Sequence, residues 1–253
     1  MEDVDTTRCS DRWADEILRA LEIFGFAWDG PVVFQTSHTR QQAYEEALRL
    51  LHAAHLVYPC ACSRKQIAGT QASPNDDGEL RYPGTCRDGL RAGAQPRAWR
   101  VRVTDEPLSF VDRMQGFVEQ RLASSIGDFV LRRADGPFAY QLAVVVDDAD
   151  QGVTDVVRGL DLLTSTPRQI YLQRLLHLPQ PRYLHVPLVL TESGEKLSKQ
   201  TGAPALDLER PGVQLWSALG FLGHAPPPEL RTATPRELWE WAIPEWRMGC
   251  RAS

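Results

Sequence analysis

Short apolar segments alternate with helix-forming segments along most of this chain, and that alternation restricts the fold more than any other feature. Amphipathic patterns predict helices at residues 10–24, 39–54, 166–178, 213–222 and 235–242. Short apolar or alternating runs predict strands at residues 32–34, 99–103, 129–131, 142–146 and 186–190. Strands that alternate with helices are typical of a sheet covered by helices, so the sequence predicts an α/β fold.

The ends of these segments carry recognisable signals. Ser10 is expected to cap the first helix, and Thr39 has the spacing of a capping box with Gln42. Residues 142–146 are expected to form a buried parallel strand that ends at Asp147 and Asp148. Paired carboxylates more often end a strand than catalyse, so these two aspartates are assigned no role.

Composition excludes several classes of protein. Of 253 residues, 43% are hydrophobic and 24% are charged, which suffices for a sizeable core and excludes a mostly disordered chain. The longest apolar runs span only about four or five residues, so no transmembrane helix is expected. The acidic start predicts no signal peptide, and a cytoplasmic, reduced protein is expected. A net charge of −5 argues against coating nucleic acid by charge, but it allows a local basic surface.

A cysteine-rich segment with many glycines and prolines, from residue 58 to about 95, interrupts the alternation. It contains Cys60, Cys62 and Cys86, three of the five cysteines in the chain. A segment this irregular has little core of its own, and a metal would supply the missing stability. Thiolates suit zinc, so the spacing predicts a zinc site. The alternative is a set of free structural cysteines.

Zinc takes four ligands, and the segment offers no fourth cysteine. The residues leave several candidates for the remaining position: the Tyr82 phenolate, a histidine or water. His52 and His55 share a face of the preceding helix, although His55 lies only five residues before Cys60 and the pair is equally typical of a partly buried helix face.

A polar loop after the predicted strand at 186–190 holds two of the three lysines in the chain, Lys196 and Lys199. A mobile loop with two ammonium groups and a hydroxyl can neutralise a polyphosphate as its charge grows in a transition state. Lysine suits this role because it is a compact charge on a long stem. An exposed Lys/Ser loop is common, so the loop gains meaning only from other motifs.

Several segments resemble motifs of the class I glutamyl-tRNA synthetases, and they follow one another in the order found in that family. Residues 196–200, KLSKQ, resemble the KMSKS signature, and residues 1–8 resemble the RIEDTDxxR segment. Residues 138–148 and 152–159 look like the second catalytic half. The Cys-x-Cys…Tyr-x-x-x-Cys pattern, the KLSKQ form and the short length point to the glutamyl-Q tRNA(Asp) synthetase branch, which lacks the anticodon-binding domain. The resemblance runs from Glu2 to about Trp246.

The resemblance implies a reaction, its partners and its site residues. The family activates glutamate with ATP without tRNA and transfers it to queuosine in the anticodon of tRNA(Asp). Mg²⁺ is expected with the ATP, and a monomer is expected. By the resemblance, Glu2, Tyr140 and Arg158 bind glutamate, and Lys199 contacts the ATP phosphates, with Lys196 beside it in the catalytic loop. The zinc ligands are then Cys60, Cys62, Tyr82 and Cys86.

The same resemblance implies a Rossmann-like catalytic domain with an inserted zinc-containing α+β subdomain. The expected parts are the remainder of a first Rossmann half at 1–57, the insertion at 58–135, the second half with the lysine loop at 136–205, and a helical C-terminal segment at 206–253.

One departure from the family concerns its HIGH motif. None of the six histidines in this sequence lies in a segment that resembles that motif. The expectation is an N-terminally truncated chain whose true start lies upstream, and which is inactive or nearly so as it stands. The alternatives are an inactive tRNA- or zinc-binding remnant and a truncated glutamyl-tRNA synthetase that charges the tRNA 3′ end.

Overall fold

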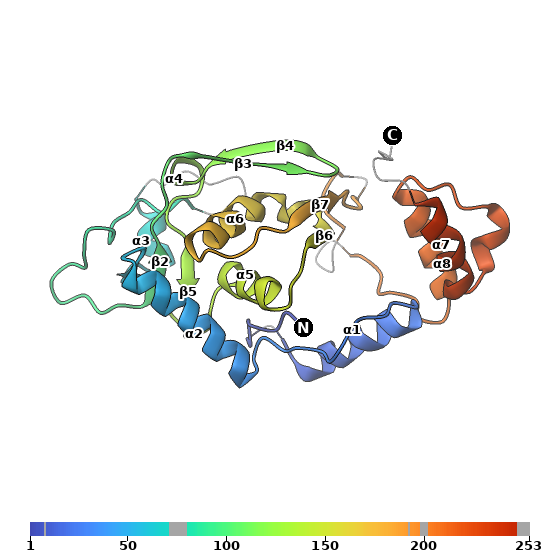
Figure 1. The fold of residues 1–253 in the computed structure, drawn as a ribbon, viewed down its shortest axis with the longest axis horizontal. Helices are drawn as coiled ribbons and strands as arrows, with labels where there is room; N and C mark the ends of the chain where they lie inside the picture. The colour runs from blue at the N-terminus through green and yellow to red at the C-terminus, as the bar shows by residue number, and fades with distance from the viewer. Residues whose placement is uncertain (8, 71–79, 192, 198–201, 247–253) are drawn as a thin grey trace. The chain divides into compact units, whose positions relative to one another are not determined.

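The computed structural model describes residues 1–7, 9–70, 80–191, 193–197 and 202–246 (Figure 1). The chain divides into two compact units, each built from separate stretches. The first unit comprises Met1–Cys9, Val32–Val156 and Leu162–Tyr183. The second comprises Ser10–Pro31, Val157–Asp161 and Leu184–Ser253. The four-part division expected from the sequence stays a prediction.

In the described part of the chain, one antiparallel sheet has the strand order β1 (Val57–Cys60), β2 (Ala98–Val101) and β5 (Val130–Arg132). Tyr58 stands opposite Arg100 in its register. Helix α2 (His38–Ala53) leads into β1 and contacts it, and the short helices α3 (Arg64–Ala68) and α4 (Leu122–Ser125) follow in the same region. The predicted strands at 99–103 and 129–131 are confirmed by β2 and β5.

A second sheet has the order β4 (Gly116–Arg121), β3 (Pro107–Asp112), β7 (Arg182–Val186) and β6 (Asp155–Gly159) among the described residues. β3 and β4 form an antiparallel hairpin, whereas β3 and β7 run parallel, with Asp112 opposite Tyr183. Helix α5 (Tyr140–Asp150) and helix α6 (Thr166–Leu175), which follows the 3-10 turn η1 (Leu160–Ser165), pack together, and α6 lies against β3 (Figure 1). The first unit is therefore a mixed α/β structure around one large apolar core.

The second unit contains α1 (Asp11–Ile23), α7 (Pro211–Phe221), the 3-10 turn η3 (Pro228–Thr232) and α8 (Pro235–Glu245). Helices α7 and α8 pack side by side (Figure 1). Their core contains Phe24, whose carbonyl accepts a hydrogen bond from the Trp239 indole at 2.8 Å. A Cβ at Gly212 would lie 1.9 Å from the Ala233 carbonyl oxygen, so only glycine allows this approach. The helices predicted at residues 213–222 and 235–242 are confirmed by α7 and α8.

The prediction of a strand at residues 142–146 is wrong, because these residues lie within helix α5. Every side chain from Leu142 to Asp147 is buried. A helix that is covered on all sides has a continuous apolar sequence, and such a run cannot be distinguished from a buried strand by its periodicity.

Two other strand predictions also need correction. Residues 32–34 are assigned to no strand among the described residues; the segment runs beside the N-terminus, where Gln35 N donates to the Met1 carbonyl at 3.3 Å. Strand β7 ends at Val186, where the predicted strand begins, because Pro187 has no N–H to continue a ladder.

The helix starts were predicted with mixed success. Ser10 caps α1, accepting a hydrogen bond from Trp13 N at 3.4 Å. Helix α2 begins one residue before Thr39, with Ser37 at the capping position, so the capping box expected there is wrong. None of the described helices has the length and apolar character needed to cross a membrane.

Candidate functional site

Four side chains of the cysteine-rich segment meet in the first unit and are called the cysteine centre here: Cys60, Cys62, Tyr82 and Cys86. Cys60 ends β1 and Cys62 precedes α3, while Tyr82 and Cys86 belong to the loop that follows. The three Sγ atoms lie within 4.8 Å of one another, and Cys62 Sγ is 3.6 Å from Cys86 Sγ. The Tyr82 Oη lies 3.4 Å from Cys60 Sγ and 3.7 Å from Cys62 Sγ. The centre therefore brings one phenol and three thiols together.

Three of these separations, 3.4, 3.6 and 3.7 Å, are close to the edges of a tetrahedron around one zinc ion. A Zn–S bond of about 2.3 Å places two sulfur ligands about 3.8 Å apart, and a shorter Zn–O bond reduces the sulfur–oxygen edge to about 3.5 Å. The residues present thus fit zinc in number, type and spacing. Neither His52 nor His55 joins the group: the His52 ring contacts Trp99 instead, with 5.2 Å between ring centroids.

Burial of the centre opposes the ionisation of its side chains when no cation is bound. Burial raises the pKa of the Cys62 thiol to about 11, with the neighbouring thiols adding to the effect. Burial also raises the pKa of Tyr82 well above its ordinary value, as do its hydrogen bonds with Cys60 and Cys86. Burial acts in the same sense on Cys86, but hydrogen bonds from the Ala61 backbone and Tyr82 hold its pKa below the usual value. Several ligand protons must therefore leave when a metal binds.

Arg100 places a positive charge beside this centre. Its guanidinium lies over the Tyr82 ring, 3.9 Å from the centroid, and its Nε donates to Cys60 Sγ at 3.4 Å. A cation in this position stabilises a thiolate and a phenolate. Asp128, which is buried nearby, accepts from Tyr58 Oη at 2.6 Å and from Val103 N at 2.8 Å, and pairs with Arg87. Arg87 directly follows Cys86, so this carboxylate ties the loop to the first sheet.

The residues expected to bind glutamate come from both units. Glu2 is exposed in the N-terminal segment, and Tyr140 is the half-buried first residue of α5. Arg158 lies on β6 within the second unit, where its Nε donates to His185 Nε2 at 3.0 Å.

The lysine loop is described only in part. Leu190 forms an antiparallel bridge with Lys196, and Leu197 N donates to the Val189 carbonyl at 2.8 Å, so the loop leaves the strand region as a narrow hairpin. Lys196 forms an ion pair with Asp161 at the start of η1. Lys199 lies outside the described residues, and its predicted role stays a prediction.

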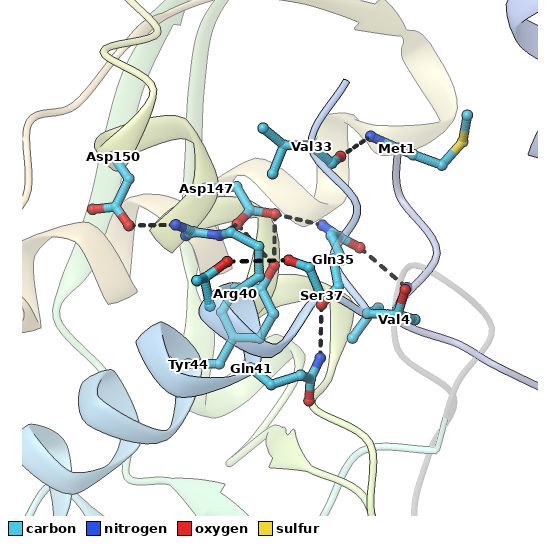
Figure 2. A network of polar contacts seen from close by, with 12 residues as sticks. Met1, Val4, Val33, Gln35, Ser37, Arg40, Gln41, Tyr44, Asp147 and Asp150 are labelled. Carbon is cyan, nitrogen blue, oxygen red and sulfur yellow. Dashed lines mark hydrogen bonds and ion pairs between the residues drawn. The ribbon is translucent and has the colours of Figure 1, made fainter. Parts of the chain in front are cut away.

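Sequence reasoning assigned no role to Asp147, yet its buried carboxylate is the hub of a group of contacts shown in Figure 2. Gln35 Nε2 donates to it at 2.8 Å, Arg40 Nε at 2.7 Å and Tyr44 Oη at 2.8 Å. Arg40 also pairs with Asp150 at 2.7 Å. We call these five residues the Asp147 network.

The Asp147 network also holds the N-terminal segment. The Gln35 side chain donates to Asp147 with its amide nitrogen and accepts from Val4 N with its oxygen, at 3.3 Å (Figure 2). Thr36 Oγ1 donates to the Asp3 carboxylate at 2.5 Å. The backbone on both sides of Glu2 is thus fixed to the loop before α2. The one sequence signal for this hub was a charged residue that directly follows an uninterrupted apolar run.

Comparison with known proteins decides the family. Residues 1–211 match the family described as tRNA synthetases class I (E and Q), catalytic domain. The chain belongs to this family of class I tRNA synthetases. The predicted resemblance and the predicted class of enzyme, an aminoacyl-tRNA synthetase-like ligase, are therefore confirmed.

Comparison with individual relatives identifies the branch of the family. The synthetase is 55% identical over 246 residues to the glutamyl-Q tRNA(Asp) synthetase of Dechloromonas aromatica, an alignment that covers 97% of this chain and 81% of that protein. It is 54% identical to the protein of the same name from Thiobacillus denitrificans, with 98% and 81% covered, and 53% identical to that of Geobacter sulfurreducens, with 96% and 78% covered. The predicted branch of the family is thereby confirmed.

Solved structures support the fold of this synthetase. A glutamate-tRNA synthetase from Elizabethkingia anophelis matches with a TM-score of 0.70 at 21% identity, over 94% of this chain and 57% of that one. A glutamate tRNA ligase from Elizabethkingia meningosepticum matches with a TM-score of 0.64 at 23% identity, over 80% and 45%. The chain thus spans about half the length of these structures, and the predicted Rossmann-like class I catalytic fold is confirmed.

Proposed function

We propose that this synthetase activates glutamate with ATP, without tRNA, and transfers it to queuosine in the anticodon of tRNA(Asp). The observation that carries the proposal is the 55% identity over 97% of the chain to a glutamyl-Q tRNA(Asp) synthetase. The enzyme acts as a cytoplasmic monomer, and its nucleic-acid partner is the anticodon stem-loop of tRNA(Asp).

The glutamate site follows from the chemistry of three side chains. Arg158 offers a planar pair of N–H donors to a carboxylate, which a point charge cannot match. Glu2 pairs with the α-ammonium group, and Tyr140 donates or accepts with its hydroxyl. What supports this assignment is the fixing of two of these residues: His185 holds the Arg158 guanidinium, and the Asp147 network holds the backbone beside Glu2.

Lys196 and Lys199 neutralise the ATP phosphates, together with Mg²⁺. Activation releases pyrophosphate, so negative charge develops on the leaving phosphates, where preorganised ammonium groups stabilise it. The ion pair between Lys196 and Asp161 keeps the start of the loop close to the strand that carries Arg158.

A zinc ion held by Cys60, Cys62, Tyr82 and Cys86 has a structural role in this proposal. When bound, it would join the end of β1 to the loop that carries Tyr82 and Cys86, and these four side chains would hold it. The support is the match between the ligand separations and a zinc tetrahedron.

Glutamate-dependent exchange between pyrophosphate and ATP tests the activation step. The exchange is expected without tRNA, and Arg158→Ala should lower kcat/KM for glutamate by about a hundredfold. Arg236→Ala, in an exposed part of α8, is the matched control and should leave the rate unchanged. Absence of exchange both from this chain and from a chain extended upstream of Met1 would contradict the proposal.

The transfer step needs its own assay, with radiolabelled glutamate and three tRNAs. Label should appear on tRNA(Asp) that contains queuosine, and neither on tRNA(Asp) that lacks it nor on tRNA(Glu). Charging of the 3′ end of tRNA(Glu) would identify a glutamyl-tRNA synthetase instead. Activation without transfer to any of the three tRNAs would also contradict the proposed acceptor.

A further inference from the structure

We infer that His185 is a positioning residue for the glutamate site, because it fixes the orientation of the Arg158 guanidinium. The inference rests on the proposed function. Arg158 lies on β6 and His185 on β7, which are neighbours in the second sheet. The Arg158 Nε donates to His185 Nε2 at 3.0 Å, and His185 has no exposed surface.

The direction of this hydrogen bond defines the state of the histidine. An arginine guanidinium is always protonated and can only donate, so His185 Nε2 must accept. The imidazole is therefore neutral and carries its proton on Nδ1. In a fully buried position, a neutral acceptor supports the arginine without adding a second positive charge beside it.

The hydrogen bond to His185 also determines which part of the guanidinium can bind a substrate. With Nε held by His185, rotation about the end of the arginine side chain is restricted, and a carboxylate pairs with the Nη end. An arginine that is already oriented loses less conformational entropy when glutamate binds. Removal of the histidine acceptor should therefore weaken glutamate binding and leave ATP binding unchanged.

The backbone that follows Arg158 is closely surrounded. A Cβ at Gly159 would lie 2.5 Å from the Asp161 carboxylate and 3.1 Å from Leu188, so the chain turns in a confined space directly after the arginine. Long arginine side chains retain several rotamers even on a fixed backbone, and a buried hydrogen-bond partner selects one of them.

The test compares His185→Leu with His185→Gln. A glutamine places its Oε1 near the position of Nε2 and still accepts from Arg158, whereas leucine fills similar space and accepts nothing. His185→Leu is expected to raise KM for glutamate and the dissociation constant measured by calorimetry by about tenfold or more, with kcat and KM for ATP within about threefold of wild type. His185→Gln should restore glutamate affinity to within about threefold of wild type.

A double-mutant cycle with Arg158→Lys separates positioning from general support of the fold, because lysine has no Nε donor at that place. In the Arg158→Lys background, His185→Leu should weaken glutamate binding no further. Equal losses in both backgrounds would overturn the inference, as would unchanged glutamate binding in His185→Leu. Thermal unfolding shows whether each variant is folded; if the leucine variant does not fold, a loss of glutamate affinity of about tenfold or more in the folded glutamine variant overturns the inference. A wild-type protein that binds no glutamate would refute the proposed function instead.

Discussion

The cysteine centre and the Asp147 network both join parts of the first unit that are far apart in sequence. They differ in how the charge of their acidic groups is compensated. In the Asp147 network, a buried carboxylate receives donors from three side chains of the same chain, one of them charged. In the cysteine centre, three thiols and a phenol are grouped, and burial raises the pKa of Cys62 and of Tyr82. The first is complete in itself, while the second has the composition of a site that a metal completes.

The comparison shows why the two regions should respond to different treatments. A network of internal hydrogen bonds depends on each donor and is indifferent to metal. A thiol-rich centre depends on the cation that replaces its protons, so its stability follows metal supply and pH.

Loss of one sulfur ligand should give the largest effect. Cys62→Ser is expected to reduce bound zinc from about one equivalent to near zero, because serine is a poor ligand for zinc in a thiolate site. Hydrogen exchange measured by mass spectrometry should then increase in residues 58–70 and 80–95. Cys9→Ser is the control, because Cys9 is exposed and lies outside the centre. A zinc-free protein with wild-type protection in these residues would contradict the assignment.

Loss of the hub of the Asp147 network should lower the free energy of unfolding by about 3–5 kcal/mol, because Asp147→Ala leaves the Arg40 guanidinium without its buried partner. Asp150→Ala removes only the exposed end of the same arginine pairing and should cost about 0–1 kcal/mol. Urea unfolding of both variants at saturating zinc makes the measurement. Equal decreases in the free energy of unfolding of the two variants would show that Asp147 contributes no more to stability than the exposed Asp150.

The same change of a phenol to a phenyl group can be made in both regions. Tyr44→Phe should lower stability by about 1–3 kcal/mol, whether zinc is present or not, because Asp147 loses one donor. Tyr82→Phe should weaken zinc binding by about tenfold or more. It should also cost the metal-free protein about 1–3 kcal/mol, because the buried Cys86 N–H loses its acceptor. Chelator competition and urea unfolding distinguish the two. A zinc-dependent effect of Tyr44→Phe would remove the contrast between the regions.

The two regions should also differ in their dependence on pH. The pKa of Cys62 is raised to about 11, so its thiol is protonated near neutral pH and must release a proton when zinc binds. Zinc affinity should therefore rise with pH, by about tenfold per unit for each proton released, from pH 6 to 9. Titration against a chelator of known pH dependence measures this rise. A flat profile would show that the thiols are already ionised without metal.

Several features of this protein could be read from the sequence because they depend on neighbouring residues. Ser10 caps α1 through a backbone group three residues away, and the spacing of Cys60, Cys62 and Cys86 indicated a group of thiols that the structure places together. The order of short motifs indicated the family, and the comparisons confirm it. Such signals depend on residues that are close together in the chain, so a single sequence contains them.

Other features were decided only by the tertiary structure. Residues 142–146 lie in a helix that is covered on every side, so their apolar run is uninterrupted and does not show which period it follows. Asp147 becomes a hub through partners more than 100 residues away, and His185 supports Arg158 only because β6 and β7 are neighbours in the sheet. Contacts at such separations depend on strand order and helix packing, which the properties of adjacent residues do not specify.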